Sequence, residues 1–114
     1  MPYVGIHTSQ HLTEEKIDRI QKEIGRIISI IPGKVSENCM IHITGDQKMF
    51  MGGKPMNATF CEIRMRNKAP YKEKQEFTVE LNKVLTAEIE GMEKLFVNMQ
   101  EYFEWGVGPS YTVS

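Results

Sequence analysis

Residues 3–44 have the sequence YVGIHTSQHLTEEKIDRIQKEIGRIISIIPGKVSENCMIHIT, and their apolar spacing changes twice. Residues 3–8 alternate apolar and polar side chains, as a half-buried strand does. The isoleucines that follow recur three, four or one positions apart, which predicts one buried helix face: Ile17, Ile20, Ile24, Ile27, Ile28 and Ile31. Residues 39–44 alternate again, so the stretch predicts a strand–helix–strand unit.

Capping signals set the expected limits of this helix. Thr13 can serve as the N-cap because its hydroxyl accepts a hydrogen bond from a backbone N–H of the first turn. Pro32-Gly33 is expected to end the helix. Two opposite-charge pairs four residues apart are expected on the exposed face: Glu15–Arg19 and Asp18–Lys22.

The second half of the chain repeats the pattern. Residues 58–66 predict a strand, Pro70 suits a helix start, and Gly91 is a plausible C-cap. The expected buried stripe of this helix is Phe77, Leu81, Val84, Leu85 and Ile89. Residues 95–100 predict a last long strand. The tail through residues 105–113 is expected to add a short strand after a turn.

Two such units define the expected fold class. A strand–helix–strand connection is right-handed and pairs its strands in parallel. We therefore expect an α+β fold in which two β-α-β halves form a four-stranded mixed sheet with both helices on one face. A length of 114 residues suits one domain over residues 1–114.

The two faces of the predicted sheet differ in character. The face under the helices carries Val4, Ile6, Ile41, Ile43, Cys61, Ile63 and Val97. The other face carries Tyr3, His7, His42, Thr44, Glu62, Arg64, Arg66 and Asn98. A polar second face is compatible with solvent, with a bound ligand, or with the interior of an assembly.

Composition excludes several function classes. A net charge of −1 gives no electrostatic case for nucleic acid or anionic membrane. No apolar run reaches the ~18 residues of a membrane span, and no signal peptide is apparent, so we expect a cytoplasmic protein. The isolated Cys39 and Cys61 are expected to be buried thiols. The three histidines lack paired metal-ligand spacing, so neither a metal nor a cofactor is expected.

Pro2 and Lys34 are the candidate chemical groups. Removal of Met1 would leave Pro2 as a secondary amine, and burial disfavours the charged form of an α-amino group whose pKa starts near ~7.7–8.0. Such an amine is a candidate base, although a second-position proline also suits the start of an edge strand. Lys34 would lie near Pro2 if residues 3–8 and 39–44 pair in parallel, because both then begin at one end of the sheet.

The chain resembles the macrophage migration inhibitory factor branch of the tautomerase superfamily. The matching segments occur in order along essentially the whole chain: Met1-Pro2, Pro32-Gly33-Lys34, residues 41–43 and 46–53, residues 58–64, and Phe96-Val97-Asn98. The Asp46-Gln47 to Gly52-Gly53 segment, together with Pro2 and Lys34, carries most of the specificity.

The resemblance implies a mechanism and an assembly. It implies a homotrimer whose sheets enclose a channel, with active sites between subunits. Pro2 would be the catalytic base, Lys34 would bind the substrate carboxylate, and the backbone of Met65 and Arg66 would help to hold the substrate. Asn98 would come from a neighbouring subunit. The implied reaction is keto–enol tautomerisation of a phenylpyruvate-like keto acid.

Four departures qualify these expectations. Phe96 stands where the vertebrate cytokine has an active-site tyrosine, so a substrate hydrogen bond is lost there. Ala58 breaks the cytokine's CxxC, so no thiol-redox role is expected. Arg66 replaces an apolar residue near the pocket and favours a more acidic substrate, and Trp105 is displaced from the usual wall position.

Two other functions stay open. The first is a non-catalytic, cytokine-like protein-binding role on the same scaffold, which a retained Met1 would favour because the nitrogen of Pro2 is then an amide. The second is an RNA-binding module, which the lack of an aromatic cluster on the middle strands argues against.

Overall fold

The computed structural model describes residues 2–114; Met1, and with it the expected removal of Met1, lies outside the described residues. The helices and strands are β1 (Tyr3–Thr8), α1 (Glu14–Ile27), β2 (Met40–Thr44), β3 (Phe50–Met51), β4 (Lys54–Pro55), β5 (Ala58–Arg66), α2 (Tyr71–Glu88), β6 (Lys94–Tyr102), β7 (Glu104–Val107) and β8 (Ser110–Val113), with short 3-10 helices at Ile28–Ile30 and Ser36–Asn38.

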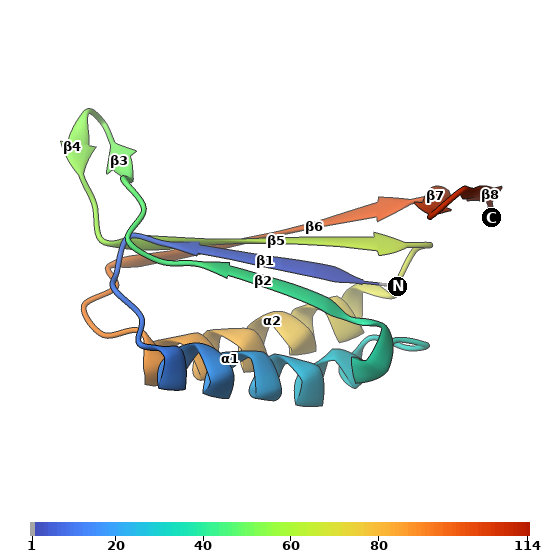
Figure 1. Cartoon of the computed structure of the whole chain (residues 1–114), viewed down its shortest axis with the longest axis horizontal. Coiled ribbons are helices and arrows are strands. Elements are labelled where there is room, and N and C mark those ends of the chain that lie inside the picture. Colours follow the sequence, from blue (N-terminus) through green and yellow to red (C-terminus); the bar gives the residue numbers. More distant parts are fainter. Residues whose placement is uncertain (1) are drawn as a thin grey trace.

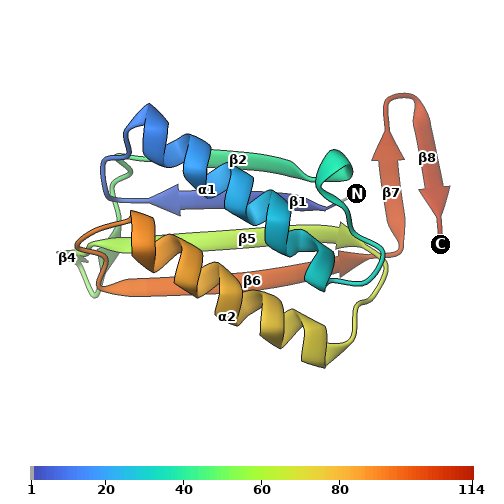
Figure 2. The ribbon, with the colours of Figure 1, turned by 90° about the horizontal axis from the view of Figure 1, so that it is seen from below.

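The central sheet has the strand order β2-β1-β5-β6. β1 pairs with β2 in parallel, β5 pairs with β6 in parallel, and β1 and β5 are antiparallel. Both helices lie across one face of this sheet (Figure 2). The predicted α+β fold with two β-α-β halves and a mixed four-stranded sheet is confirmed.

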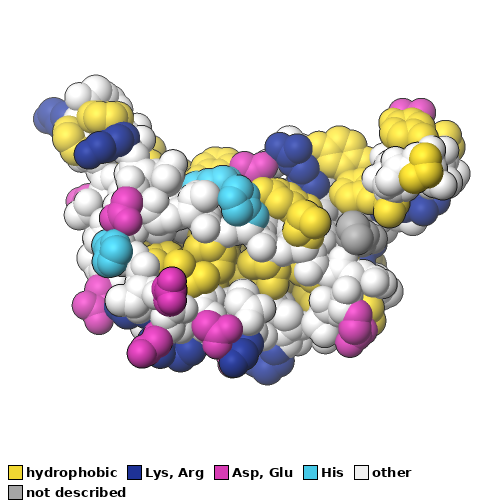
Figure 3. All heavy atoms as spheres, in the orientation of Figure 1, with side chains coloured by type: hydrophobic (Ala, Val, Ile, Leu, Met, Phe, Trp, Pro, Cys, Tyr) yellow, Lys and Arg dark blue, Asp and Glu magenta, His cyan; other side chains and the backbone are white. Residues whose placement is uncertain are grey.

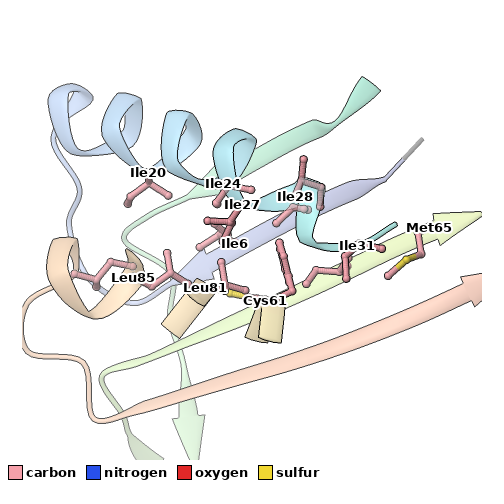
Figure 4. Packing of buried hydrophobic residues seen from close by; sticks show 14 of the residues in the cluster. Ile6, Ile20, Ile24, Ile27, Ile28, Ile31, Cys61, Met65, Leu81 and Leu85 are labelled. Atoms are coloured by element: carbon pink, nitrogen blue, oxygen red, sulfur yellow. The ribbon is translucent and has the colours of Figure 1, made fainter. Parts of the chain in front are cut away.

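Packing of the two helices on the sheet forms the core. From α1 the buried side chains are Ile20, Ile24 and Ile27, and from α2 they are Phe77, Leu81 and Leu85. They meet Val4, Ile6, Cys61 and Ile63 on the facing side of the sheet (Figure 4). Both predicted helix stripes are confirmed, with Ile17 and Val84 at their half-buried margins.

The N-terminus of α1 follows its sequence signal, but the α-helix ends at Ile27 and a 3-10 turn, Ile28–Ile30, continues the chain toward Pro32-Gly33. One of the two expected exposed pairs also differs. The Thr13 hydroxyl accepts a hydrogen bond from the Lys16 N–H at 3.2 Å. Asp18 and Lys22 pair at 2.8 Å as expected. The expected Glu15–Arg19 pair is wrong: Arg19 instead donates through Nε and Nη2 to Glu88 of α2. A two-donor contact with a carboxylate is stronger than a single i,i+4 contact.

Two segments contain more regular structure than the sequence predicted. Residues 50–55 form a β3–β4 hairpin because Gly52 and Gly53 both adopt positive φ, at 59° and 77°, as a tight two-residue hairpin requires. The tail forms the two-stranded β7–β8 ribbon. These hairpins project from opposite ends of the sheet (Figure 1). The ribbon lies at the same end as the start of β1.

Three element boundaries also differ from expectation. β2 begins at Met40 rather than residue 39, and β6 extends over Lys94–Tyr102 because its whole length pairs with β5. Helix α2 is capped at Ile89, whose N–H bonds to the carbonyl of Leu85. Gly91 was the wrong cap; it occupies the following turn with φ of 76°.

The two cysteines are free thiols, with Cys61 buried and Cys39 half-buried. Burial raises the pKa of Cys61 to about 12 and that of Cys39 to about 11. Because the thiolate is the reactive form, neither side chain is a strong nucleophile at neutral pH. Among residues 2–114, no helix is long and apolar enough to cross a membrane.

Candidate functional site

Pro2 lies at the end of the sheet where β1 begins. Its carbonyl accepts a hydrogen bond from the Met40 N–H at 3.0 Å, which ties it to the start of β2. Because β1 and β5 are antiparallel, with Tyr3 opposite Arg64, Pro2 lies at the level where β5 ends. Pro2 is buried, and strand alternation places it on the side of Val4, facing the helices.

Lys34 reaches the same end of the sheet from the loop between α1 and β2. Its Nζ donates to the backbone carbonyl of Arg66 at 2.9 Å. The side chain is half-buried, and burial, followed by the charge of Arg66, lowers the pKa of Lys34. An ammonium group has three donors, and this contact uses one. Lys34 is thus held at the carboxyl end of β5 with donors left for a ligand.

Arg66 is half-buried on the open face of the sheet, the face without helices. Its Nε donates to the Ser114 hydroxyl at 2.9 Å, so the end of the tail lies against it. The tail is itself fixed there because the Ser114 N–H donates to the carbonyl of Phe103 at 2.7 Å.

Met65 can contribute to a site only through its backbone. Its side chain is 1% exposed and points to the helix side of β5, near Ile31 (Figure 4). The buried thioether is thus unavailable to a ligand, and the expected backbone role of Met65 stays a prediction.

Phe96 and Asn98 do not meet Pro2 within one chain. Phe96 lies opposite Phe60, which is opposite His7. His7 is five residues beyond Pro2 along β1, roughly 17 Å at the usual rise per residue. Asn98 pairs with Glu62, opposite Gly5, and is also on the far side of β5. One protomer therefore brings together Pro2, Lys34 and the end of β5, but neither Phe96 nor Asn98.

A groove surrounds Phe96 at the opposite end of the sheet. It encloses about 420 Å³ and is lined by Met49, Phe50, Met51, Met56, Ala58, Thr59, Phe60 and Phe96. Phe60 and Phe96 stack with ring centroids 6.3 Å apart. Sequence reasoning missed Phe50 and Phe60 as site-lining residues. The run of apolar residues around Gly52-Gly53, on a hairpin too short to bury them, was the available signal.

The open sheet face carries a row of hydrogen-bonded side chains. His7 contacts the Thr44 hydroxyl through Nδ1 at 2.7 Å and Glu62 through Nε2 at 3.1 Å. Arg64 donates to the other oxygen of Glu62 at 2.8 Å. In Figure 3 histidine side chains lie between the two projecting hairpins, whose surfaces expose hydrophobic groups. The polar face is therefore largely satisfied within the protomer.

Two β-α-β halves that share one mixed four-stranded sheet, with both helices on one face, make up an α+β fold. The family described as Macrophage migration inhibitory factor (MIF) matches residues 1–113, and the chain belongs to this family. No curated protein matches the sequence.

Solved structures share the fold at low sequence identity. MIF2 of Leishmania major is similar with a TM-score of 0.86 and 17% identity, over 98% of this chain and 97% of that chain. The MIF-like protein of Entamoeba histolytica has a TM-score of 0.81 and 22% identity, over 97% and 98%. A fused 4-OT described as an asymmetric trimer has a TM-score of 0.77 and 14% identity, over 95% and 94%.

Proposed function

We propose that the protein is a keto–enol tautomerase for small, carboxylate-bearing keto acids of the phenylpyruvate type, with Pro2 as general base. The family and the fold support a tautomerase-like or MIF-like role. The observation that carries the finer proposal is the meeting of Pro2 and Lys34 at one sheet end, through the Met40–Pro2 and Lys34–Arg66 backbone contacts.

The chemistry follows from these placements. Once Met1 is removed, burial favours the neutral form of the Pro2 amine, which can accept a proton. Pro2 takes a proton from the carbon next to the keto group and returns it to the oxygen, or performs the reverse. Lys34 binds the carboxylate and offsets the negative charge of the enolate. The isomerisation balances without a cofactor.

A homotrimer would complete the site. Phe96 and Asn98 are too far from Pro2 in one protomer, so a second copy must supply them. The similarity to a trimeric 4-OT and the exposed apolar side chains of both hairpins, such as Phe50 (64%) and Tyr111 (68%), support self-association. The free thiols fit the cytoplasmic location proposed for this protein.

The direct test is the rate of phenylpyruvate keto–enol interconversion by protein whose mass shows that Met1 is absent. Turnover well above the buffer rate is expected. No turnover by such protein, with the fold intact by circular dichroism, would reject the proposal and favour the non-catalytic, protein-binding role.

Replacing Lys34 by alanine should raise KM for phenylpyruvate about tenfold, because a charge-assisted hydrogen bond is lost. Anion binding needs the ammonium form, which is lost as pH rises through the pKa. Since the pKa of Lys34 lies below its ordinary 10.5, KM of the unsubstituted protein should begin to rise below pH 10.5.

The matched control is Lys72→Ala, on the exposed first turn of α2. It should leave KM and its pH profile unchanged. An equal KM for the Lys34→Ala and Lys72→Ala proteins would contradict the carboxylate-binding role of Lys34.

A further inference from the structure

Two cationic side chains, Lys34 and Arg66, lie at the end of the sheet that holds Pro2. A substrate with a single carboxylate would neutralise only one of these two charges. Lys34 and Arg66 are both half-buried, and burial, followed by the nearby charge of Arg66, lowers the pKa of Lys34. Among residues 2–114, no carboxylate forms an ion pair with either side chain. The whole chain has a net charge of −1, so this local excess is not a general property of the protein.

Arg64 provides an internal comparison for Arg66. The two arginines lie two residues apart on β5 and point to the same face of the sheet. Arg64 is neutralised by Glu62, with Nη2 to Oε1 at 2.8 Å. Arg66 is instead held by the uncharged hydroxyl of Ser114. The structure therefore orients the Arg66 guanidinium without neutralising it.

The donors of Arg66 suit a carboxylate. A guanidinium has five N–H groups, and the Ser114 contact uses only the one on Nε. The N–H groups of the two Nη atoms remain for a ligand and can bind both oxygens of one carboxylate. Lys34, bonded to the Arg66 carbonyl, places a second cation beside the first. Partial burial strengthens each contact because water screens the charges less.

We propose that the substrate is a keto acid with two carboxylates, one bound by Lys34 and the second by Arg66. This inference rests on the proposed function, because it assigns the substrate class of the same site. Arg66 then determines substrate specificity because it binds the second carboxylate. Pro2 and Lys34 act on the keto acid portion that all substrates have in common.

The test compares phenylpyruvate with 4-carboxyphenylpyruvate, which differ only in the second carboxylate. With Met1 removed, kcat/KM should favour the dicarboxylate about tenfold or more. Arg66→Gln should reduce this ratio to near one, and Arg66→Lys, which keeps the charge but loses the two-donor contact, should give an intermediate ratio. Arg64→Gln is the matched control and should leave the ratio unchanged.

A binding measurement separates the two proposals. Calorimetry with the unreactive acids phenylacetate and 4-carboxyphenylacetate should show the same preference and the same loss in Arg66→Gln. If neither keto acid turns over, the tautomerase proposal fails and the calorimetric preference alone decides the role of Arg66. A ratio near one in the unsubstituted protein, or a preference that Arg66→Gln leaves unchanged, overturns the dicarboxylate assignment.

Discussion

Replacing Pro2 by glycine, in protein that has lost Met1, is expected to lower kcat/KM for phenylpyruvate about 100-fold or more, the range that a positioned general base supplies. The variant keeps a terminal amine and the backbone carbonyl that bonds to the Met40 N–H. It loses the ring, which fixes the position of the nitrogen at the head of β1. The loss should therefore fall on catalysis and not on the fold.

Tyr3→Phe is a suitable control for this variant. It changes the adjacent residue and removes only the contact between the Tyr3 hydroxyl and His42 on the opposite face of the sheet. Its kcat/KM should stay within about threefold of the unsubstituted protein. If the Pro2→Gly and Tyr3→Phe proteins have comparable kcat/KM values for phenylpyruvate, Pro2 is not the catalytic base.

Mixing two poorly active variants should restore activity. One parent is Pro2→Gly, and the other is a Phe96→Ala/Asn98→Ala double variant. If each site takes Pro2 from one subunit and residues 96 and 98 from its neighbour, random mixing in equal amounts gives intact sites at about a quarter of all positions in a symmetric ring. Unfolding and refolding the mixture together should therefore recover about a quarter of the full rate.

The control for this experiment is each parent refolded alone, which should show no recovery. A mixture that only averages the two parental rates would show that Phe96 and Asn98 do not complete the site of a neighbouring copy. The geometry argues against that result, because roughly 17 Å of strand separates the level of Phe96 from that of Pro2 within one chain.

The sequence predicted the sheet, the helices and the proximity of Lys34 to the start of β1. Those features depend on local periodicity and on the rule that β-α-β units pair in parallel. The alternation along β5 assigned Ile63 and Arg64 to opposite faces, as the structure has them. Each of these predictions needed information from only a few neighbouring residues.

The sequence did not predict features that depend on partners distant in the chain. Arg19 pairs with Glu88, which is 69 positions away, instead of with Glu15 on its own helix. The Ser114 contact of Arg66 required knowing where the tail folds back. The β3–β4 hairpin was missed because its strands have only two residues each, too few for a period-2 pattern to be recognised.

The most direct test of Pro2 as the catalytic base uses one protein in two forms that differ only in Met1. Protein that retains Met1 is assayed with phenylpyruvate before and after treatment with a methionine aminopeptidase, with the mass checked each time. We expect a rate at the buffer level before treatment and strong turnover afterwards, because only then is the nitrogen of Pro2 a base. Equal rates in the two forms would contradict a mechanism that depends on the Pro2 amine.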